Sequence, residues 1–148
     1  MLGISRQTDY ATRLVLHLAS LEPGAQVAIA EISRIRRLPI PFVRRLVGQL
    51  VKAGLITSSR GSGGGVRLAR PAAEITLLDV VQAIEGAIAL NHCVDHPEAC
   101  VMAEHCPGNR AWTGVTRALE ANLGAIRFDA LARGSEGHQA AHARLHEQ

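Results

Sequence analysis

Apolar positions in the first quarter of the chain follow a helical period of three to four residues, with polar residues between them. This period predicts one helix over residues 6–20 and a second over residues 28–37. Ser5 is placed to cap the first helix with its hydroxyl. The inward residues are expected to be Ala11, Leu14, Val15, Leu18 and Ala19 in the first helix, and Ala28, Ile32 and Ile35 in the second.

A third apolar stripe begins after the break at Leu38-Pro39-Ile40-Pro41. Pro41 suits the first turn of a helix, where a missing N–H costs nothing, and Gly54 suits the exit. Two short helices joined by a tight turn, the second with a cationic outer face, predict a helix-turn-helix that binds DNA. We expect its buried face to hold Phe42, Leu46, Leu50 and Ala53, and its DNA-reading face to hold Arg44, Arg45, Gln49 and Lys52.

Two strand-forming segments follow, at residues 55–59 and 66–69, and a flexible glycine-rich loop joins them. A hairpin placed directly after a recognition helix predicts a wing. Gly61 and Gly64 would let the backbone approach phosphates, and Arg60 and Arg67 would supply positive charge. The alternatives are a plain linker and a nucleotide-phosphate loop; the latter is disfavoured because no Gly-Lys-Ser/Thr follows and no helix opens there.

The second half of the chain predicts two further helices, over residues 77–85 and 109–123, separated by a cysteine-bearing loop. Thr76 can cap the first. The second carries an apolar seam suited to a partner helix, which favours a homodimer over packing within one chain. The seam consists of Trp112, Val115, Leu119 and Leu123.

The predicted fold is therefore mainly α: a winged helix-turn-helix with a small β-hairpin wing and a long dimerisation helix. We expect residues 1–75 to form the DNA-binding module and residues 76–133 the cysteine loop and dimerisation helix. Residues 134–148 are polar and predict a disordered tail, in which His138, His142 and His146 are more consistent with solvent exposure than with a metal site.

Charge is divided unevenly along the chain. Eleven of the 16 Lys and Arg residues lie within residues 1–70, together with only three of the 13 acidic residues. Such a division indicates a half that binds a polyanion, and arginine suits bidentate contacts to phosphate and guanine. No apolar run approaches the length of a membrane span, and the start lacks a signal-sequence pattern, so we expect a cytoplasmic protein with no membrane partner.

All three cysteines fall within 14 residues, at Cys93, Cys100 and Cys106. In a cytoplasmic protein such a group favours metal or redox chemistry over a disulfide framework. The spacing leaves three alternatives open: an iron–sulfur cluster, a zinc site that includes His92, His96 or His105, and redox-active thiols. It differs from the paired cysteines of most zinc knuckles, which slightly favours the cluster. The sequence shows no nucleophile–base arrangement that would indicate an enzyme.

Several motifs occur in the order typical of one family. They are Thr8-Asp9-Tyr10-Ala11-x-Arg13, Leu50-x-x-Ala53-Gly54-Leu55-Ile56, Arg60-Gly61-x-x-Gly64-Gly65-x-Arg67-Leu68 and Ile75-x-Leu77-x-Asp79-Val80-Val81-x-x-Ile84-Glu85, followed by the three cysteines. With them, residues 4–131 resemble the iron–sulfur winged-helix transcription regulators that include IscR, NsrR and RirA.

The resemblance implies a homodimer with exchanged long helices and a cluster, 2Fe–2S or 4Fe–4S with the latter slightly favoured, held by Cys93, Cys100 and Cys106. IscR-like members use a histidine as fourth ligand where this chain has Asn109. NsrR-like members use a carboxylate of the partner subunit's first helix, and Asp9 matches that position. Asp9 is therefore the expected fourth ligand and His105 the second choice; the first cysteine spacing is one residue longer than in the commonest family pattern.

An oxygen ligand would be the weakest corner of a thiolate-bound cluster, because soft, sulfide-bridged iron prefers sulfur. The sequence thus predicts a transcription regulator, acting as a repressor, that responds to nitric oxide, oxygen, redox state or iron–sulfur supply. The alternative is a winged-helix regulator with a zinc or thiol-redox site and no cluster.

Overall fold

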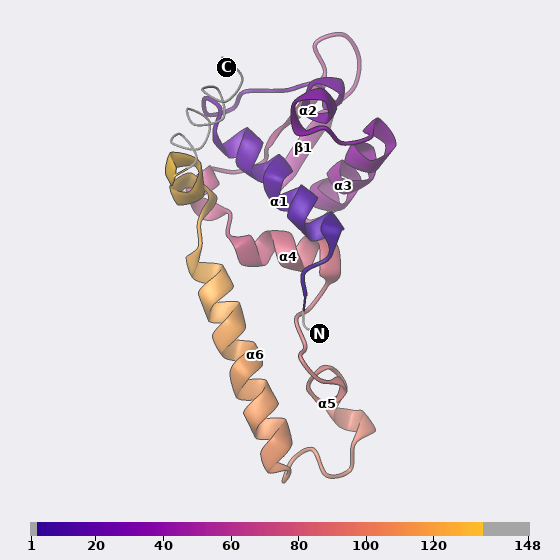
Figure 1. The fold of residues 1–148 in the computed structure, drawn as a ribbon, viewed down its shortest axis with the longest axis vertical. Coiled ribbons are helices and arrows are strands. Elements are labelled where there is room, and N and C mark those ends of the chain that lie inside the picture. The colour runs from indigo at the N-terminus through magenta and orange to yellow at the C-terminus, as the bar shows by residue number, and fades with distance from the viewer. Residues whose placement is uncertain (1–2, 135–148) are drawn as a thin grey trace, which may run out of the picture.

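The computed structural model describes residues 3–134, which are mainly helical (Figure 1). The N-terminal part, which the sequence predicts to bind DNA and which we call the DNA-binding half, consists of α1 (Arg6–Ala19), α2 (Ile29–Arg36), α3 (Ile40–Lys52), β1 (Ile56–Ser59) and β2 (Gly65–Leu68). After it come η1 (Ala72–Glu74), α4 (Leu77–Glu85), α5 (His92–Asp95), η2 (Pro97–Ala99) and α6 (Pro107–Ala125). Residues 128–134 are also helical. The expected mainly α, winged helix-turn-helix fold is confirmed.

The predicted caps form at the starts of two helices. The Ser5 hydroxyl accepts the Thr8 amide at 3.3 Å, which satisfies one of the free N–H groups of the first turn of α1. At α4, the Asp79 amide donates to the Thr76 hydroxyl at 3.2 Å, while the Thr76 amide donates to the Asp79 carboxylate at 2.8 Å. This reciprocal pair is a capping box, and it fixes where α4 begins.

One hydrophobic core joins α1, α2, α3, the hairpin and α4. Leu14, Leu46 and Leu50 are fully buried in it, and Phe128 reaches it from beyond α6. The Phe128 amide also donates to the Ile75 carbonyl at 3.0 Å. The core of the DNA-binding half thus includes α4 and a residue close to the end of the described chain, both of them beyond residue 75.

Three expectations about the inward faces are wrong. Ala28 is exposed, because it is the N-cap residue of α2 and lies before the helix proper. Ala53 is exposed because α3 ends at Lys52, one residue earlier, and Val43 and Val47 fill the face instead. Ile35 is 41% exposed, since it lies in the last turn of the eight-residue α2, whose contact with the core is made by Ile32 and, in part, by Ile29.

The wing is a two-stranded antiparallel hairpin with a third strand-like contact on its other side. Ile56 pairs with Leu68 and Ser59 with Gly65. On the far edge of β2, Val27 and Val66 exchange backbone hydrogen bonds of 2.9 and 2.8 Å. Gly65 is required at this contact, because a Cβ there would lie 2.4 Å from the Val27 carbonyl oxygen.

The second half extends away from this core. α4 packs on α1, α3 and α6, and α6 then runs down one side of the molecule (Figure 1). The segment between α4 and α6 carries α5 and η2 and packs against the lower end of α6. We call residues 86–106 the cysteine arm. Among residues 3–134, no helix combines the length and apolar character that crossing a membrane requires.

A polar pair is buried inside the DNA-binding half. His17 is only 9% exposed, and its Nδ1 lies 3.2 Å from a terminal nitrogen of Arg36, the last residue of α2. Burial, reinforced by the positive charge of Arg36, lowers the pKa of His17. His17 is therefore neutral at pH 7 and can accept a hydrogen bond from Arg36, which ties α1 to the end of α2.

The close approach at Gly65 gives a stability test. Gly65→Ala should destabilise the protein by about 1–3 kcal/mol, because the new methyl group meets the Val27 backbone rather than a movable side chain. Gly48→Ala is the matched control: it lies inside α3 with open space around it, and should stabilise by about 0.5–1 kcal/mol. Urea unfolding measures both. Equal effects of the two changes would contradict the close contact between residue 65 and the Val27 segment.

Candidate functional site

The outer face of α3 is a row of cations. Arg44, Arg45 and Lys52 are exposed, and within residues 3–134 none of them forms an ion pair. Gln49, expected beside them, is only partly exposed, and its Oε1 is buried without a hydrogen-bond partner in the described chain. The helix therefore presents three free cations outward and one amide at the margin of its buried face.

The wing is more constrained than its glycine content suggested. Gly61 and Gly63 have φ angles of +93° and +79°, which L side chains rarely adopt, and the Gly64 amide closes a turn by donating to the Gly61 carbonyl at 2.9 Å. Arg60 is exposed at the start of this turn. Arg67 is exposed on β2, where its Nε donates to the Thr57 hydroxyl at 3.3 Å. The wing tip therefore forms a defined turn in this structure, and the flexibility of the loop stays a prediction.

Two further arginines extend the cationic surface. Arg34 and Arg37 are exposed at the end of α2 and, in the part of the chain that the structure describes, pair with no carboxylate. Arg37 caps α2 in the left-handed conformation with φ of 53°, a position usually taken by glycine. Neither residue was among the DNA-contacting residues expected from the sequence; the signal for them was the accumulation of arginines at the end of the second predicted helix.

The three cysteines lie on the cysteine arm and at its junction with α6. Cys93 is in α5, Cys100 follows η2 and Cys106 is the N-cap residue of α6. All three are free thiols of intermediate burial. Their donor chemistry therefore fits a thiolate-bound metal or cluster, and equally fits thiol oxidation.

Asn109 links the first turn of α6 to the middle of the cysteine arm. Its side-chain amide donates to the Cys93 carbonyl at 2.7 Å, across 16 residues of sequence. Since Asn109 lies in the first turn of α6, which Cys106 caps, this bond anchors the backbone of one cysteine beside the helix that begins at another. The amide of Asn109 is thus engaged with backbone.

The thiols are not gathered into a preformed metal site in this single chain. Within residues 3–134 no group of three or more His, Cys, Asp or Glu side chains is arranged to hold a metal ion. His96, a candidate for zinc, has a carboxylate near each ring nitrogen: Glu98 at 3.2 Å from Nδ1 and Asp95 at 3.3 Å from Nε2. His105 is exposed beside Cys106.

Asp9 lies in the first turn of α1, half exposed, and pairs with Arg13 at 2.8 Å. The Arg13 guanidinium lies 5.6 Å from the centre of the Tyr10 ring, which meets Phe42 of α3 edge to face at 5.4 Å. An exposed ion pair of this kind contributes about 0–1 kcal/mol, so Asp9 can exchange its partner at small cost. The carboxylate is thus available, and its neighbours connect it to the start of α3.

Glu85 joins the root of the arm to the start of α1. Its carboxylate accepts the Ser5 amide at 3.2 Å and the hydroxyl of the buried Thr8 in a short hydrogen bond. Hydrogen bonds from Ser5 and Thr8 lower the pKa of Glu85. Because Glu85 is the last residue of α4, the arm leaves the module from a point hydrogen-bonded to the helix turn that carries Asp9.

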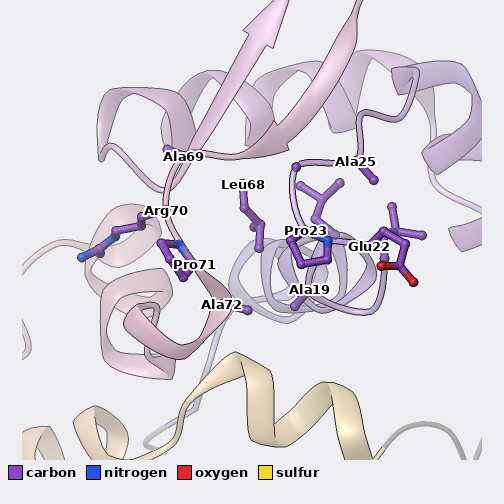
Figure 2. A pocket seen from close by; sticks show the side chains of 12 residues that line it. Ala19, Glu22, Pro23, Ala25, Leu68, Ala69, Arg70, Pro71 and Ala72 are labelled. Carbon is purple, nitrogen blue, oxygen red and sulfur yellow. The ribbon is translucent and has the colours of Figure 1, made fainter.

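A cavity of about 270 Å³ lies elsewhere, between the loop after α1 and the segment after β2 (Figure 2). Leu18, Pro23, Leu68 and Pro71 contribute apolar surface to it, and Arg70 extends away from the other walls in Figure 2. The Arg70 guanidinium instead lies 3.4 Å from Asp79. None of the cysteines lines this cavity, so it is separate from the candidate sensing site.

The exposed cations of α3, followed by a hairpin that the Val27 segment holds along β2, are the arrangement typical of a winged-helix DNA-binding protein. The chain belongs to the Rrf2 family, described as iron-dependent transcriptional regulators, whose profile matches residues 4–134. The resemblance inferred from the sequence motifs is thereby confirmed, and so is the assignment as a transcription regulator.

Known proteins of this kind are similar over most of their length. A curated relative, Protein aau3 of Rhizobium meliloti (strain 1021), is 37% identical over 110 residues, 73% of this chain and 70% of the relative. The structure of CymR (YrzC), the global cysteine regulator of B. subtilis, matches with a TM-score of 0.73 and 26% identity, covering 90% of this chain and 98% of CymR. T. potens IscR matches with a TM-score of 0.70 and 26% identity, covering 92% of this chain and 90% of IscR.

Proposed function

We propose that this protein is a homodimeric, cytoplasmic DNA-binding repressor whose affinity for its operator is set by an iron–sulfur cluster on Cys93, Cys100 and Cys106. The observation that carries the proposal is the position of the arm: three free thiols lie on a segment whose root, Glu85, is hydrogen-bonded to α1 of the DNA-binding module. A change at the thiols therefore has a direct structural route to the recognition surface.

The three thiols supply three ligands of the type that iron–sulfur clusters use. The iron-dependent character of the family and the similarity to IscR support this cofactor, with 4Fe–4S slightly favoured over 2Fe–2S. When bound, the cluster would supply iron that reacts with nitric oxide or oxygen or changes redox state. The chain's own contribution is to hold the thiols on one short arm and to transmit the arm's conformation to α1.

The cofactor proposal is tested by anaerobic purification. The protein should be brown and contain iron and acid-labile sulfide, and Cys93→Ala, Cys100→Ala or Cys106→Ala should each abolish the visible absorbance, because each removes one thiolate corner. His138→Ala, outside the described residues, is the control and should leave the spectrum unchanged. A colourless protein with one zinc per chain would reject the cluster.

A thiol-redox regulator is the second candidate. It is favoured by the three free thiols of the arm and by the similarity to S. aureus CymR, whose structure was determined in an oxidized form. That structure matches with a TM-score of 0.67 and 27% identity, over 88% of this chain and 96% of CymR. A colourless, metal-free protein whose DNA affinity responds to oxidation of its cysteines would establish this function instead.

An unpartnered apolar surface on α6 supports the homodimer. Trp112 and Val115 are 42% and 52% exposed, and Leu119 and Leu123 continue the stripe into a groove of about 460 Å³ beside α4. Apolar surface of this extent along a helix that projects from the core is typical of a helix that packs against a second copy. A dimer also places two recognition helices on one DNA duplex, as a two-fold operator requires.

For DNA, we propose that α3 occupies the major groove and the wing contacts the backbone. The bases and nearby phosphates would be contacted from α3 by Arg44, Arg45, Gln49 and Lys52. The sugar–phosphate backbone beside the wing would be contacted by Arg60, Gly61, Gly64 and Arg67. In the dimer, the two recognition helices would lie roughly 34 Å apart along the duplex, one helical turn of B-DNA. This arrangement predicts different effects for wing and helix substitutions.

Substitutions in the two elements should be separable by salt and sequence. Arg60→Ala or Arg67→Ala should weaken binding to all duplexes and reduce the slope of log affinity against log salt by about one unit for each phosphate that is no longer neutralised. Arg45→Ala or Gln49→Ala should change the preferred sequence. Arg133→Ala, an exposed arginine paired with Asp129, is the control and should have neither effect. Indistinguishable behaviour of wing and helix variants across a panel of duplexes would contradict these roles.

We propose Asp9 of the partner subunit as the fourth ligand. The proposal is supported by its exposure, by its easily exchanged pairing with Arg13, and by the engagement of Asn109 with backbone. Ligation would take Asp9 from Arg13 and so alter the contact of Tyr10 with Phe42 at the start of α3. His105 is the second choice; being adjacent to Cys106, it would have to double back to reach the remaining iron.

Asp9→Ala should leave a folded dimer with a changed cluster spectrum or a shorter cluster lifetime, whereas His105→Ala should have a smaller effect. Asp95→Ala, an exposed carboxylate on the arm itself, is the control. Mixing Asp9→Ala chains with Cys93→Ala chains should restore one intact site per heterodimer, because ligand and thiols come from different subunits. An unchanged spectrum in Asp9→Ala together with damage in His105→Ala would reverse the assignment.

A further inference from the structure

One side chain outside the candidate site holds the wing tip in place. Gln26 lies in the segment between α1 and α2, and its side-chain amide donates to the Gly63 carbonyl, 37 residues away in the sequence. Gly63 is inside the turn that the Gly61 and Gly64 backbone groups close at 2.9 Å. A bond to this carbonyl fixes the plane of the peptide that follows it, and with it the turn.

The neighbouring backbone makes this bond part of a continuous anchor. Val27, next to Gln26, exchanges backbone hydrogen bonds of 2.9 and 2.8 Å with Val66. The same segment is therefore hydrogen-bonded both to β2 and to the wing-tip loop that precedes it. Close packing leaves little freedom: a Cβ at Gly64 would lie 2.5 Å from the Ser59 carbonyl oxygen. Below the tip the hairpin is held by backbone, while at the tip the Gln26 amide is the added restraint.

We propose that Gln26 is a positioning residue for DNA binding: it preorganises the wing tip so that Arg60 and the glycine backbone meet the DNA without first being ordered. Restricting a loop in its bound conformation before association strengthens binding, since less conformational freedom is lost in the complex. The inference rests on the proposed role of the wing in DNA binding. It needs no cofactor on the cysteines.

The test uses the full chain and a mixed-sequence DNA duplex of about 30 base pairs, because backbone contacts do not require a known operator. Fluorescence anisotropy of the labelled duplex should show about three- to tenfold weaker binding for Gln26→Ala, the size expected for loss of one hydrogen bond. Its midpoint of thermal unfolding should match that of the unsubstituted protein. Gln82→Ala, an exposed glutamine on α4, should bind DNA normally.

A double-mutant cycle separates positioning from direct contact. If Gln26 acts by placing the wing tip, Gln26→Ala should cost much less in an Arg60→Ala background than on its own. Hydrogen exchange should also be faster at the Gly64 amide in free Gln26→Ala protein. These two results are not expected of a residue that simply touches the DNA.

The outcomes are distinct. Weaker binding by Arg60→Ala but unchanged binding by Gln26→Ala would overturn the inference and leave the DNA-binding role of the wing intact. Full additivity of the two substitutions would also overturn it, because Gln26 would then act independently of the wing tip. Unchanged binding by both variants would overturn the role of the wing itself, and the inference with it.

Discussion

The contact between α4 and the first turn of α1 determines how the two halves of this protein are joined. Glu85 accepts hydrogen bonds from Ser5 and Thr8, and α4 also packs against α3 and α6. A displacement of the arm root therefore acts on the same helix that contributes Leu14 and Val15 to the core. The helix α4 is therefore the element that contacts both α6 and the helices α1 and α3 of the DNA-binding half.

That surface is built from two parts with different rigidity. α3 is fixed by fully buried residues such as Leu46 and Leu50, so its exposed arginines are carried on a firm support. The wing has no such core at its tip and depends on hydrogen bonds from the Val27 segment. Cations on α3 are suited to reading sequence, which demands fixed geometry, whereas wing cations need only a defined position beside the phosphates.

Periodicity predicted the helices, the hairpin and the caps well, because they depend on local spacing and on residues such as Ser5 and Thr76. Periodicity failed to predict burial where tertiary contacts determine it. Ile35 fits the helical period of α2, but it lies beyond the part of the helix that packs on the core. The wing glycines predicted flexibility, yet a long-range bond from Gln26 constrains the turn. The grouping of the cysteines was visible in the sequence, and the Asp9–Arg13 pair follows from i,i+4 spacing on a helix. No local signal could show that Asn109 would bind the Cys93 backbone, 16 residues away.

The arm has little stability of its own, and this suits a sensing element. Between residues 86 and 106, all of which the structure describes, Ala103 is the single buried residue, while Val101 and Met102 are 99% and 63% exposed. A segment that buries so little has few contacts to resist rearrangement. Binding or oxidation at the thiols would therefore meet little resistance from the arm, because few packing contacts within the arm would have to be broken. The Glu85 bonds attach the root of the arm to the start of α1, and the Asn109 bond attaches the backbone of Cys93 to the first turn of α6.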